Sequence, residues 1–490
     1  MNMSLFFNTR EYEGKIFSGT WSQGQALIHD TIEPASGEPL FKLGMGSRED
    51  VETAVSIAAE TQAAWADLAF DQRAGVIRRA AELLQIHAKD FIEWNVRECG
   101  STYLKAQWEL HAAYEQLNMA SALPMQADGM TFPSSMPQRR NTCRRVPLGV
   151  VGVIAPWNFP LLLSMRSVAP ALALGNTVVL KPDFHSGVTG GLLIARLFEE
   201  AGLPEGVLHV VPGGADAGDA LVRHPKSAMI SFTGSTAVGK SIGKICGEML
   251  KKVALELGGN NAFVVLEDAD LDAAASNGAW GSYLHQGQIC MQAGRHFVHE
   301  SVAEAYVQKL TERARQLKVA DPFKDETAAI GPLVNLKQLE RIEAIIQSSI
   351  ERGAKRVTGG RGEGLFYHPT VLCNVTAEMP AFSEELFAPV APVITFTSED
   401  ELVELIAQSP YGLAAAIQSA SVSRAMHLAR RIKAGMIHIN DQTVNNEFHV
   451  PFGGVGDSGN SGRFGGPANL EMFTELQWLS IMDTPIHYPF

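Results

Sequence analysis

The sequence is poor in cysteine, and its basic residues are dispersed. Five cysteines, an odd number, are scattered through the 490 residues: Cys99, Cys143, Cys246, Cys290 and Cys373. No Cys-x-x-Cys pair or mixed Cys/His cluster has zinc-ligand spacing, so we expect no metal site and no disulfide framework. No lysine- or arginine-rich run offsets the formal net charge of −13, which argues against nucleic acid or an anionic membrane as a partner.

Long apolar runs are also missing. The first ten residues have no charged start followed by a long apolar core, so they do not resemble a secretory signal. The segment closest to a membrane span, residues 149–165, is interrupted by Pro156, Asn158 and Pro160 and is shorter than a spanning helix. We therefore expect a soluble, cytoplasmic protein.

Apolar residues are abundant, at 46% of the chain, and the length predicts two or three domains. The first 130 residues have a mostly helical pattern, in which Val51, Ala54, Val55 and Ala58 fall on one helical face. Residues 129–146 differ, because their prolines and polar residues are typical of an extended hairpin.

From residue 147 onward, short apolar segments alternate with helical ones. Strands are predicted at 150–154, 177–180, 207–211 and 229–232, with a helix at 188–200. Strands and helices at this spacing form right-handed βαβ units, so the pattern predicts an α/β fold with a parallel sheet. A second αβ region is predicted from 258 to 440, and the apolar tail from 478 to 490 is extended.

Short polar or glycine-containing loops follow the predicted strands. They are Pro156-Trp157-Asn158, Lys181-Pro182, Pro212-Gly213-Gly214 and Thr233-Gly234-Ser235. Ligands of open parallel sheets bind beyond the carboxyl ends of the strands. Four such loops in succession predict a nucleotide cleft.

The stretch around Cys290 has the composition of a nucleophile's loop. Cys290 stands among Gln, Gly and small residues, which favours an accessible, turn-like setting. Glu256 stands beside two glycines, which suggests that the surrounding backbone must stay slim. Glu256 and Cys290 are 290 − 256 = 34 residues apart, enough for a strand and a helix to return both side chains to one pocket. A thiolate adds readily to an aldehyde, and a partly buried carboxylate can activate water to cleave the resulting thioester. The alternatives are a buried structural thiol at Cys290, a surface charge or helix cap at Glu256, and a simple turn at Asn158.

A different class of function is suggested by residues 234–241. They match the phosphate-loop pattern Gly-x-x-x-x-Gly-Lys-Ser, and a strand precedes them. A nucleoside triphosphatase would leave Cys290, Glu256, Asn158 and Lys181 without a use, so we rank this alternative low. Both interpretations share a helix N-terminus suited to a phosphate.

Five ordered motifs resemble those of the aldehyde dehydrogenase superfamily. They are Leu-Glu-Leu-Gly-Gly-Asn at 255–260, Gly-Gln-Ile-Cys at 287–290, Pro-Trp-Asn-Phe-Pro at 156–160, Glu-Glu-Leu-Phe-Ala-Pro at 384–389 and Pro-Phe-Gly-Gly at 451–454. The resemblance extends from about residue 14 to residue 490. Residues 94–100, 165–170, 284–287 and 488–490 are most similar to the bacterial benzaldehyde dehydrogenases within that superfamily.

The resemblance implies an aldehyde dehydrogenase-like architecture with three parts. Residues 1–128 and 147–257 would form a Rossmann-like cofactor-binding domain, and residues 258–450 an α/β catalytic domain. Residues 129–146 and 472–490 would form a β oligomerisation arm. A homo-oligomer, a dimer or a tetramer, is the expected assembly.

The resemblance also assigns roles. Cys290 would attack the aldehyde, Asn158 and the Cys290 backbone N–H would hold the oxyanion, and Glu256 would activate water to release the carboxylic acid. The cofactor would be bound by Trp157, Lys181, Gly214, Gly234, Ser235, Glu385 and Phe387.

Two departures from the family pattern concern the cofactor and the helix expected after Asn158. Phe184 stands where NAD-preferring relatives often carry a glutamate, and the nearby carboxylate is Asp183. We expect NAD, with NADP as the alternative. Ser167 stands where many relatives have a lysine, and the role of the adjacent Arg166 is left open.

The predicted substrate pocket is apolar. Phe159, Leu162, Leu163 and Phe452 are expected to line it, which suits an aromatic aldehyde better than a charged semialdehyde. A medium-chain aliphatic aldehyde is the alternative substrate. Glu256 favours hydrolysis to the free acid over transfer to coenzyme A, and a complete set of reactive residues argues against a non-catalytic structural protein.

Overall fold

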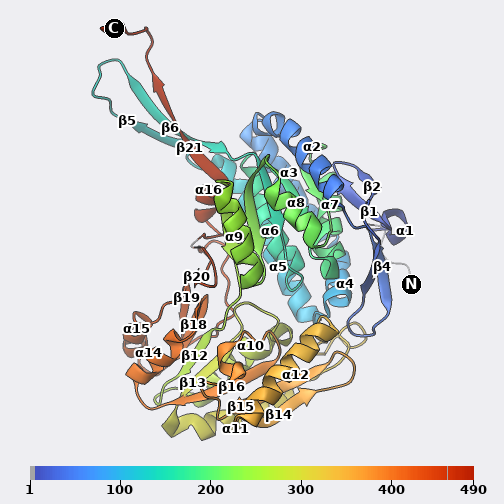
Figure 1. The fold of residues 1–490 in the computed structure, drawn as a ribbon, viewed down its shortest axis with the longest axis vertical. Helices are drawn as coiled ribbons and strands as arrows, with labels where there is room; N and C mark the ends of the chain where they lie inside the picture. Colours follow the sequence, from blue (N-terminus) through green and yellow to red (C-terminus); the bar gives the residue numbers. More distant parts are fainter. Residues whose placement is uncertain (1–5, 461) are drawn as a thin grey trace.

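The computed structural model describes residues 6–460 and 462–490. These residues form two large sheets flanked by helices and a smaller three-stranded sheet that projects away from the body (Figure 1). No helix of the described residues is long and apolar enough to cross a membrane.

The first sheet has seven strands in the order β11-β10-β7-β8-β9-β1-β2. Five of them are parallel to one another: β7 (Val150–Ile154), β8 (Thr177–Lys181), β9 (Leu208–Val210), β10 (Ser227–Thr233) and β11 (Lys252–Glu256). The strands predicted from 150 to 232 are therefore confirmed. Every residue of β7, β8 and β9 is buried, because helices cover both faces of a parallel sheet.

The first 130 residues are less helical than expected. Four strands come before the first long helix: β1 (Lys15–Ser18), β2 (Trp21–Gln23), β3 (His29–Ile32) and β4 (Pro39–Leu43). They are only three to five residues long, too short for a clear alternation of apolar and polar residues. The β1 and β2 strands extend the first sheet through antiparallel pairing of β1 with β9.

Long helices pack on this sheet. They are α2 (Arg48–Ala66), α3 (Phe70–Ile86), α4 (Ala88–Cys99), α5 (Tyr103–Ala122), α6 (Pro160–Ala173), α7 (Leu193–Glu200), α8 (Ala215–Arg223) and α9 (Thr236–Glu248). The predicted apolar face of α2 is buried at Val51, Ala54, Val55 and Ala58. The helix predicted at 188–200 begins with a π-helical turn over Val188–Leu192.

The second sheet has the order β14-β15-β16-β13-β12-β18-β19. Its strands are β12 (Ala262–Val265), β13 (Arg295–His299), β14 (Lys355–Arg361), β15 (Tyr367–Cys373), β16 (Val390–Phe396), β18 (Ala414–Gln418) and β19 (Met436–Ile439). The longer helices of this region are α10 (Leu271–Tyr283), α11 (Glu300–Gln316), α12 (Leu336–Glu351), α14 (Glu399–Ala407) and α15 (Val422–Ala429). The chain crosses from the first sheet to the second between Glu256 and Ala262.

The projecting sheet joins two distant parts of the chain. The predicted hairpin is present as β5 (Gly129–Phe132) and β6 (Arg140–Pro147), and β21 (Thr474–Ile481) pairs with β6 along its whole length. The short helix α16 (Ala468–Phe473) leads into β21 at the base of this arm (Figure 1).

The strand order places several loops at one edge of the first sheet. β7 lies between β8 and β10, so the chain leaves β7 in one direction and later returns on its other side. Loops diverge at such a point and leave a crevice at the carboxyl ends of the strands. Asn158 follows β7, Ser235 follows β10, and Glu256 is the last residue of β11.

Candidate active site

Cys290 lies in a loop that follows α10, and two strained residues precede it. His285 and Gln286 have φ values of +48° and +57°, a left-handed conformation that costs a non-glycine residue on the order of 1–3 kcal/mol. Hydrogen bonds hold the strained turn in place: Gln286 Nε2 donates to the carbonyl oxygens of Gly100 at 2.8 Å and Pro332 at 2.9 Å.

The turn-like setting expected for this loop is present, but its glutamines are not accessible. Gln286 and Gln288 are both fully buried. Gln288 Oε1 accepts a hydrogen bond from the backbone N–H of Val334 at 3.0 Å. These amides anchor the loop to neighbouring segments, and the Cys290 residue itself remains half-buried.

Glycines bring the backbone after Glu256 against the Cys290 loop. A Cβ at Gly259 would lie 2.3 Å from the carbonyl oxygen of Cys290, closer than any side chain permits. Asn261 Nδ2 donates to the same oxygen at 2.9 Å. A Cβ at Gly258 would lie 2.5 Å from Glu385 Oε2. The two glycines next to the glutamate therefore permit the close approach that the sequence suggested.

The Glu256 carboxyl is buried, with 3% of the residue exposed. Burial raises its pKa to about 8, although the positive charges of Arg166 and Arg463 act in the opposite direction. Its Oε1 has no hydrogen-bond partner among the described residues. A carboxyl with a pKa near neutrality and a free oxygen suits a general base.

The Cys290 thiol lies in an environment that disfavours its charged form. Burial raises its pKa to about 12, and the carboxylates of Glu256 and Glu385 act in the same direction. Arg166 acts in the opposite direction. Asn158 is buried beside the Cys290 loop, where its Nδ2 donates to the carbonyl oxygen of Gln288 at 2.9 Å.

A cavity of about 230 Å³ opens beside Cys290. Asn158 and the four predicted substrate-pocket residues line it: Phe159, Leu162, Leu163 and Phe452. The cavity is also lined by residues that were not predicted from the sequence, among them Lys105, Trp108, Trp280, Leu284, Met291 and Asn446. The wall is mainly apolar and aromatic, with a few amide and charged groups.

A buried ion pair supports this wall. Lys105 Nζ and Glu109 Oε2 are 2.5 Å apart, and both side chains are at most 1% exposed. Glu109 Oε1 accepts the backbone N–H of Leu162 at 3.0 Å, at the start of α6, and Lys105 Nζ lies 4.5 Å from the centroid of the Phe159 ring. The pair therefore fixes the first turn of the helix that follows Asn158.

The nucleotide cleft predicted at the carboxyl edge of the first sheet is a cavity of about 700 Å³. Five residues expected to bind the cofactor line it: Trp157, Lys181, Gly214, Gly234 and Ser235. Nothing lies within 4 Å of a Cβ built at Gly214, and Ser235 makes no side-chain cap bond at the N-terminus of α9. Free backbone N–H groups at a helix N-terminus suit a phosphate group, so the cavity fits a dinucleotide.

Glu385 and Phe387, the other two residues expected to bind the cofactor, do not line this cavity and instead contact Gly259 and Trp157, respectively. Glu385 Oε1 accepts the backbone N–H of Gly259 at 2.9 Å, and burial raises the pKa of Glu385 to about 7. The Phe387 ring meets the Trp157 ring edge-on, with 5.6 Å between their centroids.

Phe184 occupies the position three residues after Lys181 where a glutamate is common in NAD-preferring relatives, and the nearby carboxylate, that of Asp183, is engaged by His185. The Asp183 contacts are local. Asp183 Oδ1 accepts the backbone N–H of His185 at 2.9 Å and lies 2.7 Å from His185 Nδ1. The Phe184 ring packs edge-on against His29 at 4.8 Å. Lys181 lines the cleft with its Nζ 3.3 Å from the carbonyl oxygen of Pro182.

The segment that resembles a phosphate loop does not hold its lysine over the cleft. The side chain of Lys240 is 62% exposed and forms an ion pair with Asp457 at 2.8 Å. Among the described residues, no group of three or more His, Cys, Asp or Glu side chains has a geometry that could hold a metal ion.

Comparison with known proteins places these features in a family context. Residues 21–479 match the model of the aldehyde dehydrogenase family. The chain is 52% identical to a benzaldehyde dehydrogenase [NAD(+)] from Pseudomonas putida over 97% of this chain and 98% of that protein. It is 50% identical to a vanillin dehydrogenase from an Amycolatopsis strain over 99% of this chain and 100% of that protein.

Solved structures show the same fold. A salicylaldehyde dehydrogenase from Pseudomonas putida G7, complexed with salicylaldehyde, matches with a TM-score of 0.94 and 34% identity over 98% of this chain and 99% of that chain. A betaine aldehyde dehydrogenase from Staphylococcus aureus in complex with NAD+ matches with a TM-score of 0.94 and 28% identity over 98% and 97%.

The buried pair of Lys105 and Glu109 generates a stability prediction. Glu109→Gln leaves the Lys105 ammonium buried without a carboxylate, so we expect the free energy of unfolding to fall by about 3–5 kcal/mol. Glu82→Gln removes an exposed pair with Arg79 and should cost less than about 1 kcal/mol. Denaturant unfolding of both variants checks the difference, and equal losses would contradict the structural role of the pair.

Proposed function

Because the chain belongs to the aldehyde dehydrogenase family, we propose that Cys290, Glu256 and Asn158 catalyse the oxidation of an aldehyde by NAD through a covalent intermediate. The enzyme uses NAD and oxidises aromatic aldehydes of the benzaldehyde type to carboxylic acids. Its relatives do not favour a medium-chain aliphatic substrate or a nucleoside triphosphatase. The observation that best supports the proposed mechanism is the contact between the Glu256 segment and the Cys290 loop, beside an aromatic-lined cavity.

In the first step, the Cys290 thiolate attacks the aldehyde carbon, and the carbonyl oxygen becomes an alkoxide in a thiohemiacetal. The Asn158 amide and the backbone N–H of Cys290 are the proposed donors to this oxygen. Asn158 is suited to the task because its side chain already lies against the loop, where it bonds Gln288. Fixed donors in a site shielded from water stabilise developing charge more than they do in bulk solvent.

NAD, when bound, would supply the hydride acceptor, and loss of a hydride from the former carbonyl carbon would leave a thioester on Cys290. The proposed residues for holding this cofactor are Trp157, Lys181, Gly214, Gly234, Ser235, Glu385 and Phe387. Lys181 supplies a cation for the nucleotide, the loop at Gly214 leaves room for it, and Glu385 supplies a carboxylate oxygen for a ribose hydroxyl.

Glu256 then removes a proton from water, and the resulting hydroxide attacks the thioester carbon. The carbon–sulfur bond breaks, the acid leaves, and Cys290 regains its electron pair as a thiolate. Because burial raises the Glu256 pKa to about 8, the fraction present as carboxylate increases as the pH rises through that value. The proposed base is therefore mostly protonated at neutral pH, and turnover that depends on it should rise as the pH approaches that value.

The cavity supports an aromatic substrate. Phe159, Leu162, Leu163 and Phe452 provide an apolar wall, and Trp108 and Trp280 extend it. A flat ring buries much apolar surface between such side chains and makes favourable edge or stacked contacts with aromatic ones.

We expect the substrate preference to be visible in kcat/KM. With NAD, benzaldehyde should exceed hexanal by about tenfold, which corresponds to ~1.4 kcal/mol of transition-state stabilisation. Reduced nicotinamide absorbance measures both rates, and NADP in parallel should give the lower value. A higher kcat/KM for hexanal, or for NADP with benzaldehyde, would count against the respective assignment.

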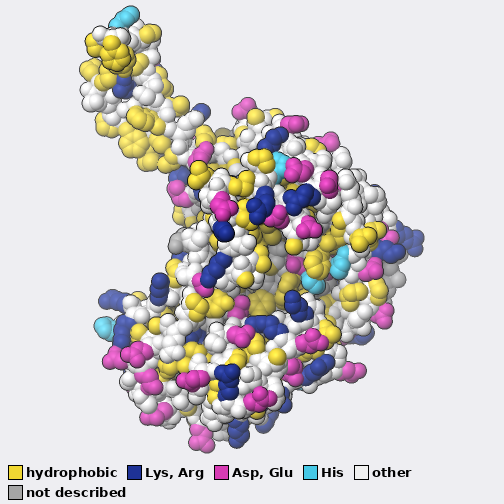
Figure 2. Space-filling view, in the orientation of Figure 1, with side chains coloured by type: hydrophobic (Ala, Val, Ile, Leu, Met, Phe, Trp, Pro, Cys, Tyr) yellow, Lys and Arg dark blue, Asp and Glu magenta, His cyan; other side chains and the backbone are white. Residues whose placement is uncertain are grey.

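The projecting sheet supports a proposal about assembly. In the arm formed by β5, β6 and β21, strand β21 has one unpaired edge, and Figure 2 shows apolar side chains along the projection. Its exposed large apolar residues are Met130, Phe132, Leu476, Trp478 and Ile481. Such a patch on a projecting sheet suits contact with a second copy of this chain, giving a dimer or tetramer.

Five free cysteines are in keeping with a cytoplasmic location, which we also propose.

The arm generates a prediction about oligomeric state. Trp478→Asp places a charge on a side chain that is 68% exposed in the single chain, so it should dissociate the oligomer. Leu27→Asp, at a site that is 91% exposed in the segment between β2 and β3 and away from the arm, is the matched control. Sedimentation velocity measures both. A monomeric unmodified protein, or an oligomer that withstands Trp478→Asp, would contradict the proposal.

A further inference from the structure

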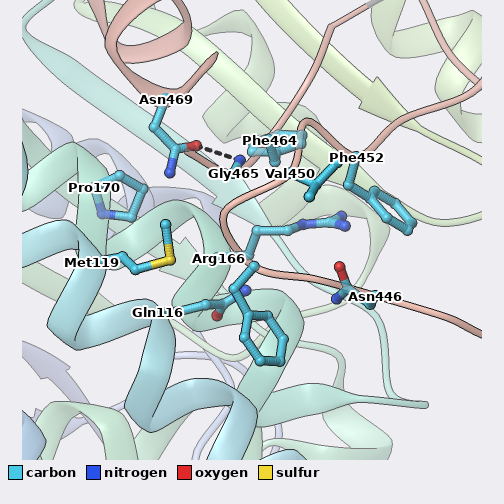
Figure 3. Close-up of a pocket in the computed structure, with 11 residues that line it drawn as sticks. Gln116, Met119, Arg166, Pro170, Asn446, Val450, Phe452, Phe464, Gly465 and Asn469 are labelled. Atoms are coloured by element: carbon cyan, nitrogen blue, oxygen red, sulfur yellow. Dashed lines mark hydrogen bonds between the residues drawn. The ribbon is translucent and has the colours of Figure 1, made fainter. Parts of the chain in front are cut away.

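Arg166 occupies a buried position between two aromatic rings. It is 7% exposed, and its guanidinium carbon lies 5.1 Å from the Phe452 ring centroid and 4.7 Å from that of Phe464. Its Nη2 donates to Thr233 Oγ1 at 2.9 Å. Figure 3 shows the side chain extending from α6 toward Phe452 and Asn446. The guanidinium is therefore held in one place by stacking and by a hydrogen bond.

The Thr233 contact brings this charge next to the proposed base. Thr233 ends β10 and is the register partner of Glu256 on the neighbouring parallel strand β11. Arg166 also lines the 230 Å³ cavity that contains Cys290. One guanidinium thus reaches the surroundings of both the proposed nucleophile and the proposed base.

Among the described residues, Arg166 lacks a paired carboxylate, which usually offsets the free-energy cost of burying a guanidinium. In the part of the chain that the structure describes, Arg166 forms no hydrogen bond to a carboxylate, and its Nε has no hydrogen-bond partner. A buried guanidinium without a carboxylate is costly, so packing alone does not account for an arginine here. Its charge acts on groups a little farther away.

We propose that Arg166 is a positioning residue whose fixed positive charge favours the thiolate of Cys290 and the carboxylate of Glu256. This inference rests on the function proposed above, because it assigns a role to Arg166 through those two residues. It also assigns a role to Arg166, which the sequence left open.

The other charged side chains near Cys290 and Glu256 do not lower the pKa of both groups. Burial and the carboxylates of Glu256 and Glu385 raise the pKa of Cys290, and Arg166 lowers it. Arg166 and Arg463 both lower the pKa of Glu256. The remaining titratable side chains at the cavity wall or against Phe159 are Lys105, which is paired with Glu109, and His285, whose pKa burial lowers well below its usual value. Arg166 is the cation common to both groups.

Alkylation of Cys290 by iodoacetamide in the free enzyme tests the proposal directly. Arg166→Met removes the charge and keeps an apolar chain, so the pH profile of alkylation should move up by at least about one unit. That shift makes alkylation near neutral pH about tenfold slower. The pH profile of acid release from benzaldehyde should move in the same direction, because Glu256 loses the same neighbour.

Two controls separate charge from packing. Arg166→Lys keeps a cation and should stay within about half a pH unit of the unmodified enzyme. Ser167→Ala removes the neighbouring hydrogen bond to Ser231 Oγ without changing charge, so it should not move either profile. If Arg166→Met does not fold, Arg166→Gln, which keeps a donor for Thr233, serves as the neutral variant.

The outcomes distinguish this inference from the proposed function. Unshifted profiles in the neutral variant, or an equal shift in Arg166→Lys, would overturn the role of Arg166 while leaving the mechanism intact. Substantial turnover by Cys290→Ala would instead refute the proposed function on which the inference rests.

Discussion

The structure depends on a close backbone approach between two sheets. Gly259, just after the first sheet ends, lies so near the Cys290 carbonyl oxygen that a Cβ there would be 2.3 Å away. Asn261 reinforces the contact with hydrogen bonds from its Nδ2 to the carbonyl oxygens of Cys290 and Gln292. This contact brings a carboxyl from the edge of one sheet and a thiol from a loop of the other into one site. A larger residue at Gly259 would force them apart.

The same contact buries two groups, Glu256 and Cys290, whose charged forms are disfavoured there. Burial raises the pKa of both Glu256 and Cys290, and the Glu256 carboxylate raises the pKa of Cys290 further. The proposed chemistry needs a thiolate in one step and a carboxylate in another. A fixed cation near both groups offsets part of that cost, and Arg166 occupies such a position because aromatic rings and Thr233 hold it there.

Much of this architecture is visible in the sequence, because it depends on local patterns. The βαβ alternation from residue 147, the hairpin at 129–146 and the motifs around Glu256 and Cys290 each lie within a short window. The burial of Gln286 and Gln288 was not predictable, since their partners Gly100, Pro332 and Val334 are distant in the chain.

Tertiary packing also determines the roles of residues that could not be assigned from the sequence. Lys105 and Glu109, spaced four apart on α5, have the pattern of an exposed helical pair, and the packing of α5 against α4 and α6 buries them. Arg166 was conspicuous in an apolar helix, yet its role depends on rings contributed by residues 452 and 464. The short strands β1 to β4 were missed because three to five residues carry too little periodicity.

In the proposed mechanism, Cys290 carries the acyl group and Glu256 activates the water that releases it. Glu256→Gln keeps the shape of the side chain but removes the base, so benzaldehyde and NAD should give one burst of reduced cofactor and then very slow acid production. Mass spectrometry of the quenched protein should find the acyl group on the peptide containing Cys290, in contrast to the Glu82→Gln control. Unchanged steady turnover without an acyl adduct on that peptide would show that Cys290 does not carry the acyl group and that Glu256 is not the base.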